Sequence, residues 1–270
     1  MKGLKMKERE KTQKKAANLP FALYCAISLA VFAAILFLPR EPGLLSERGR
    51  YLAIGFSQTA LIAISSMLGF YSASKFTFES TLGKAISLIS AGVASWALAN
   101  AIWTGYTLAG VDMPYPSIAD IFYLGIIPLS LAGAFFLLKS FDVKLDKKTL
   151  LKYSVLPAIA AIPLLYFFVF DKIFEDVDPL MKLLNIAYPL GDVMFVSGAI
   201  FVFFASRSSE MFKPTAVLLA GYCAFAIADF GFVATTALGT YYTGNWVTAL
   251  FTLGLATVGA GLYLFRRAVE

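Results

Sequence analysis

Long apolar runs separated by short polar or charged segments make up most of the chain. A helix that crosses a bilayer needs about 20 mostly apolar residues, and eight runs approach or exceed that length. The third and fourth runs, and the seventh and eighth, are joined by very short turns, so each pair is expected to form a helical hairpin. The pattern predicts an all-α polytopic membrane protein with eight transmembrane helices, near residues 20–39, 51–74, 84–110, 117–139, 150–170, 180–206, 213–238 and 243–266.

The first run follows a basic segment, as a secretory signal sequence does. Its apolar stretch is too long for a signal sequence and no small-x-small cleavage site follows it. We expect it to remain as a permanent helix. Residues 1–19 are then a basic cytoplasmic tail that binds anionic lipid or stays disordered.

The two halves of the chain resemble each other. An offset of 129 residues aligns the first four runs with the last four without a gap, placing Ala91–Asn100 on Ala220–Asp229 and Gly110 on Gly239. Four spans is an even number, so both units enter the membrane from the same side. The sequence predicts two parallel four-helix membrane repeats, residues 20–139 and 150–267, related by an axis along the membrane normal.

The orientation follows from the basic residues between the runs. With eight spans, 18 of the 23 Lys and Arg fall on the side of the N-terminus and five on the other side. Basic residues in short loops favour the cytoplasmic side. We therefore expect a multi-pass protein of the cytoplasmic membrane with both termini in the cytoplasm.

Composition removes several classes of chemistry. The chain has no histidine, which excludes a Ser-His-Asp triad and histidine-ligated zinc or haem, and its two cysteines, Cys25 and Cys223, both lie in apolar runs. We expect no metal site, no cofactor and no disulfide. The net charge of +6 comes largely from the basic tail, so topology explains it and no nucleic-acid partner is predicted.

Three acids lie inside the runs, where an ionisable side chain is costly unless it is paired or hydrated: Asp120, Asp192 and Asp229. In the predicted orientation all three occupy the outer half of the membrane, together with Asn100, which aligns with Asp229. Tyrosines and tryptophans collect at similar depth. The sequence predicts an outward-facing acidic and aromatic pocket, with candidate ligand-binding residues Asn100, Trp103, Asp120, Tyr123, Tyr188, Asp192, Asp229 and Trp246.

Each candidate also has a structural explanation. Asp120 stands three residues after Ser117, as in a helix capping box. A buried Asp229 could bond Asn100 across the repeat axis, and aromatic residues favour the membrane interface in any case. Asp192 has no local capping role, so we expect its carboxylate to line a cavity open to the outer side.

Three stretches carry a family resemblance. Pro114–Leu124 resembles the PxPSxADxFYL signature of the N-terminal multi-helix membrane region of many prokaryotic diguanylate cyclases (GGDEF proteins) and sensor kinases. Tyr188–Asp192 is similar to that region's YPLGD element, and Ala228–Asp229 to its second AD. The resemblance implies a membrane sensor fold with a site at Asp120, Tyr123, Tyr188, Asp192 and Asp229. We expect no output domain after Glu270, so cyclase or kinase activity does not carry over.

These features favour a stand-alone, non-enzymatic membrane sensor or ligand-binding module without catalytic residues. Its expected partners are membrane lipids, a small cationic or amphipathic ligand, and a separate signalling protein on the cytoplasmic side. The alternative is a secondary transporter or channel for a cation or small solute, to which intramembrane acids and parallel repeats are also suited. An intramembrane aspartyl protease is a weaker alternative, because the residues around the acids lack that family's motifs. A retinal receptor is excluded, because no lysine lies mid-span.

Overall fold

A computed structural model describes residues 2–37, 45–141, 151, 166 and 178–270. In this part of the chain, seven helices are long and apolar enough to cross a membrane. The expectation of an all-helical, polytopic membrane protein is thereby confirmed. The expected fifth span, 150–170, lies almost entirely outside the described residues, so the structure gives seven spans where the sequence predicts eight. The helices are α1 Lys2–Phe37, α2 Glu47–Ala73, α3 Thr81–Ala109, α4 Ile118–Ser140, α7 Pro179–Ala205, α8 Phe212–Ala237 and α9 Trp246–Arg267.

The N-terminal basic segment is part of α1, which begins at Lys2 and continues into the first span. The expectation of a separate or disordered tail is wrong in this respect. Lys, Glu, Gln and Ala dominate this segment and all favour the helix. The first proline occurs only at Pro20. The tyrosine hydroxyl of Tyr24 anchors α1 to the bundle, because it donates to the carbonyl of Ala256 in α9 at 2.6 Å and lies 2.8 Å from Ser65 Oγ in α2.

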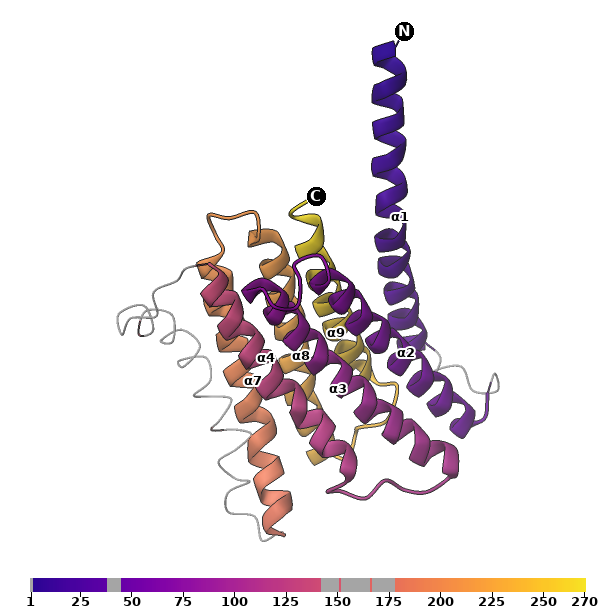
Figure 1. Ribbon diagram of the computed structural model, residues 1–270. Helices are drawn as coiled ribbons and strands as arrows, with labels where there is room; N and C mark the ends of the chain where they lie inside the picture. Colours follow the sequence, from indigo (N-terminus) through magenta and orange to yellow (C-terminus); the bar gives the residue numbers. More distant parts are fainter. Residues whose placement is uncertain (1, 38–44, 142–150, 152–165, 167–177) are drawn as a thin grey trace.

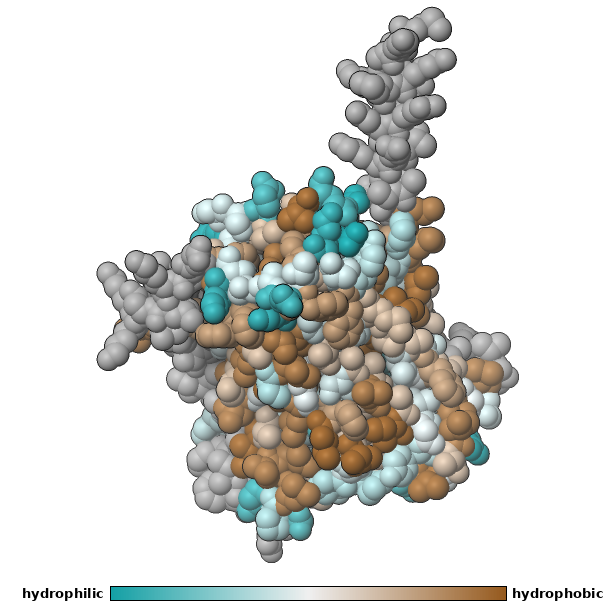
Figure 2. Space-filling view, viewed as in Figure 1, coloured by the Kyte–Doolittle hydropathy of each residue, from teal (hydrophilic) through white to brown (hydrophobic). Residues whose placement is uncertain are grey.

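The helices form one bundle in which α3 packs on α4 and α8 on α9 as antiparallel hairpins. The hairpins are joined through α2, which packs on both α3 and α9, and through α7, which packs on both α4 and α8. Most of the span of α9 is buried. Figure 1 places the C-terminus and the N-terminal end of α1 at the same end of the bundle. Hydrophobic side chains form a broad band around the visible face, with hydrophilic ones mainly toward the two ends (Figure 2).

The two hairpin connections have the same chain geometry. Gly110 after α3 and Gly239 after α8 both adopt the left-handed conformation, with φ of 71° and 66°. In each, the next residue's N–H bonds back five residues, from Val111 to Tyr106 and from Thr240 to Thr235. A glycine tolerates positive φ without steric cost, which ends the helix sharply. Both connections therefore turn back at the same end of the bundle, opposite the C-terminus.

Candidate functional site

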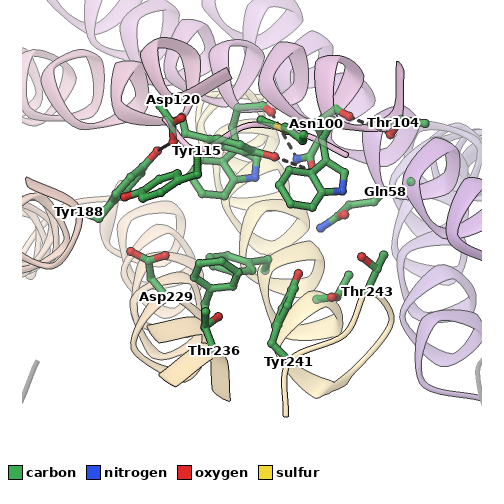
Figure 3. A pocket seen from close by; sticks show the side chains of 18 of the residues that line it. Gln58, Asn100, Thr104, Tyr115, Asp120, Tyr188, Asp229, Thr236, Tyr241 and Thr243 are labelled. Atoms are coloured by element: carbon green, nitrogen blue, oxygen red, sulfur yellow. Dashed lines mark hydrogen bonds between the residues drawn. The ribbon is translucent and has the colours of Figure 1, made fainter. Parts of the chain in front are cut away.

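A cavity of about 460 Å³ lies in the half of the bundle that carries these two connections. Side chains from α2, α3, α4, α7, α8 and α9 line it, with the connections before α4 and α9 adding Tyr115 and Tyr241. Asn100 and Thr104 lie along one side, and Asp229, Thr236 and Tyr241 along the facing side (Figure 3). Of the eight sequence-predicted residues, six line this cavity: Asn100, Trp103, Asp120, Tyr123, Tyr188 and Asp229.

Asp120 is buried at the N-terminus of α4 and makes three short contacts. Its Oδ2 accepts from the backbone N–H of Ser117 at 2.7 Å and lies 3.2 Å from Ser117 Oγ, while its Oδ1 accepts from the hydroxyl of Tyr188 at 2.6 Å. The capping box anticipated from Ser117 and Asp120 is therefore present. The Tyr188 contact adds a bridge from α4 to α7. This acid is satisfied by the protein itself.

A second bridge crosses the same end of the cavity. The hydroxyl of Tyr115 donates to Oδ1 of Asn185 in α7 at 2.8 Å. Burial, with smaller contributions from the charges of Asp120 and Asp229, raises the pKa of Tyr115 to about 12. Its hydroxyl stays protonated at neutral pH, and the bond weakens only as the pH rises from about 10, the ordinary tyrosine pKa, towards 12.

Asn100 and Asp229 both line the cavity, but they are not partners. The amide of Asn100 donates to the carbonyl of Trp96 at 3.3 Å and accepts from the hydroxyl of Tyr123 at 3.4 Å. Asp229 interacts instead with Asp192. The predicted direct pair is wrong because the local helix and Tyr123 already satisfy the amide. Asp229 thus faces the cavity from the opposite side.

Asp192 does not line the cavity, contrary to the prediction. It lies in α7 with 2% of its surface exposed, and its carboxyl group interacts directly with that of Asp229. Its Oδ2 is buried and has no hydrogen-bond partner. Depth along the span was predicted from sequence, but the rotation of α7 was not, and that rotation places Asp192 behind Asp229.

Trp246 also lies outside the cavity lining. It begins α9, is half exposed, and its ring sits where a Cβ on Gly231 would be, 2.3 Å from that position. It packs between α9 and α8 near the end of the bundle. This placement agrees with the interfacial explanation for aromatic residues at this depth.

The cavity ends on a layer of packed aromatic rings toward the termini. Trp96 contacts Tyr123 and Phe225 with ring centroids 4.5 and 4.6 Å apart, and Phe225 contacts Phe251 at 5.3 Å. Phe195 adds a further ring at 5.6 Å from Phe225. Phe195 and Phe225 are almost fully buried. These rings close the cavity on that side.

Two carboxyl groups line the cavity and no Lys or Arg does. Aromatic rings supply much of the remaining wall, and ring faces attract cations. Within the described ranges, no cluster of three or more acids or cysteines suits a metal ion. The lining can therefore hold an organic cation with apolar parts, without a metal.

Sequence reasoning missed several polar lining residues, notably Gln58 in α2 and Asn185 in α7. Gln58 is the only carboxamide in its span and is buried. Treating buried amides as costly, as intramembrane acids are treated, would have identified it. Asn185 stands one helical turn before Tyr188, on the same face. Comparison with known protein families, curated proteins and solved structures finds no match to this chain.

Proposed function

We propose that this protein is a membrane ligand-binding module, acting as a sensor for a small amphipathic organic cation. The observation that carries the proposal is the cavity of about 460 Å³, whose wall combines Asp120 and Asp229 with aromatic rings and contains no basic side chain. Cavities of about 300–1,000 Å³ suit small molecules. Asp120 is already bonded to the protein, so Asp229 is the acid left to meet the ligand.

A sensor fits this geometry better than a transporter. Transport needs a route to the opposite side of the membrane, and the layer around Trp96, Phe225 and Phe251 fills that route with packed rings. The three intramembrane acids lie in helix turns on the cavity side of this layer or beside it. We propose that a bound ligand changes helix packing, and that a separate protein on the cytoplasmic side reads the change. The resemblance of Pro114–Leu124 to sensor regions supports the same proposal.

The finer architecture is also a proposal: eight spans, in two parallel four-helix repeats. Positions 129 residues apart have matching surroundings. Gly110 and Gly239 end α3 and α8 alike, and Gly92 and Gly221 each face the next helix of their own hairpin. The packing of α2 on α9 and of α7 on α4 is a pair that the repeat exchanges. Trp96 and Phe225, also 129 apart, contact each other as residues beside a two-fold axis would.

The orientation is tested by cysteine accessibility. Asp112 lies in the connection between α3 and α4, and Ser208 in the exposed connection between α7 and α8. In a background with Cys25 and Cys223 replaced by serine, we expect Asp112→Cys to react with an impermeant maleimide on intact cells. Ser208→Cys should react only after the membrane is opened. Labelling of position 112 from the cytoplasm alone would reverse the orientation and place the cavity on the inner side.

The function is tested with tetraphenylphosphonium, an amphipathic cation that carries no proton to exchange. Purified protein in detergent should gain thermal stability with this probe, by about 2.7 kcal/mol at a hundredfold excess over the dissociation constant. Tetraphenylborate has the same shape and the opposite charge, and should give no gain. Asp229→Asn should weaken binding of the cation about tenfold or more, a loss of about 1.4 kcal/mol or greater.

Two results would overturn the proposal. One is the absence of stabilisation by tetraphenylphosphonium. The other is equal stabilisation by the cation and by tetraphenylborate, which would indicate apolar partitioning without recognition of charge. Asp229→Asn must also keep the unliganded melting temperature near the wild-type value for its loss of binding to count.

A further inference from the structure

A pair of carboxyl groups stands at the inner wall of the cavity. Asp229 in α8 lines the cavity, and Asp192 in α7 lies behind it, 2% exposed and in direct contact with it. Within the described residues, the ion pairs are those of Arg266 and Arg267 with Glu270, so neither acid has a basic partner there. The other titratable groups near Asp229 are Tyr115, which donates to Asn185, and Tyr188, which donates to Asp120.

Two carboxylates in contact, away from water and without a cation, repel each other strongly. A proton between them removes the repulsion and forms a hydrogen bond, so one group carries the proton and the other the charge. The surroundings decide which. Asp192 Oδ2 is buried and unpartnered, which is far more costly for a charged carboxylate than for the carbonyl of a neutral acid. Asp229 borders the cavity, where water or a cation meets its charge.

The geometry points to Asp192 as a protonated carboxylic acid that donates its O–H to Asp229 and aims the Asp229 carboxylate into the cavity. In this inference, which rests on the proposed function, Asp192 is a positioning residue and never touches the ligand. The proton stays between the two acids when the cation binds. Charge is balanced, because one carboxylate meets one cation.

The other half of the chain indicates that helix packing does not require this pair. At the positions 129 residues earlier stand Ala63 and Asn100, in α2 and α3. Those two helices pack against each other without an acid at either position. The matching helices α7 and α8 carry two acids in the same places. A role beyond packing explains the difference.

Infrared spectroscopy of the purified protein at neutral pH tests where the proton resides. The wild type should have the C=O stretch of a buried protonated carboxylic acid, which Asp192→Asn should remove and Asp229→Asn should keep. If the band survives Asp192→Asn and disappears in Asp229→Asn, the proton belongs to Asp229 and the inference is wrong. The absence of any such band in the wild type would also overturn it.

Binding of tetraphenylphosphonium gives a second test. Asn at position 192 can still donate an N–H to Asp229, so Asp192→Asn should bind the cation within about threefold of the wild type. Leucine fills similar space without a donor, and Asp192→Leu should weaken binding about tenfold. Equal affinity of the leucine variant and the wild type, with both folded, would refute the positioning role while leaving the proposed function intact. A wild type that fails to bind the cation refutes the proposed function instead, whatever the infrared result.

Discussion

Replacing Gly221 by alanine should lower the stability of the folded bundle by about 1–3 kcal/mol, the usual cost of overfilling a packed core. A Cβ at this position of α8 would lie 2.7 Å from the backbone nitrogen of Val258 and 2.8 Å from the carbonyl oxygen of Gly254 in α9. Both atoms belong to backbone, so no side chain can rotate away. The two helices must separate, which also loosens the wall that carries Asp229. Thermal or denaturant unfolding in a fixed detergent measures the loss.

The matched control is Gly105→Ala in α3. Gly105 is also a helical glycine, but it is exposed and a Cβ there meets nothing within 4 Å. Alanine is a better helix former than glycine by about 1 kcal/mol, so this variant should keep or slightly raise stability. If the two variants unfolded alike, close approach of α8 and α9 would not be the reason for Gly221.

Local signals in the sequence were sufficient for the helices. The seven described spans match the apolar runs to within a few residues at nearly every end. Caps account for the agreement: Ser117 and Asn245 accept backbone N–H groups at the starts of α4 and α9, and Gly110 and Gly239 end α3 and α8. Each is set by residues within one turn of the boundary. The exception is the start of α1, because charge marks where a membrane begins and not where a helix begins.

The site was only partly accessible from sequence. Cost at membrane depth selected Asp120, Asp229 and Asn100, all of which line the cavity. Depth does not fix rotation about a helix axis, which is why Asp192 was placed in the lining although it lies behind Asp229. Rotation depends on contacts between distant segments, such as that of Gly191 in α7 with Ile127 in α4.

Asp120→Ala should destabilise the unliganded protein by about 2–3 kcal/mol, the scale of lost hydrogen bonds to a charged group. The change leaves the Ser117 N–H and the Tyr188 hydroxyl without their acceptor and removes a negative charge from the positive end of α4. Tyr188→Phe removes only the bridge to α7 and should cost less. In the double variant, the two losses should fall short of their sum by about 0.5–3 kcal/mol, because the bridge is lost only once.

The same variants separate the structural role of Asp120 from ligand binding. Because Asp229 remains in place, Asp120→Ala should keep most of the stabilisation by tetraphenylphosphonium, measured from its own lower melting temperature. Asp229→Asn should behave in the opposite way, with near-normal unliganded stability and a lost response to the cation. An Asp120→Ala protein that melts like the wild type yet no longer responds to the cation would contradict this division of roles, and would make Asp120 the charged group that the ligand meets.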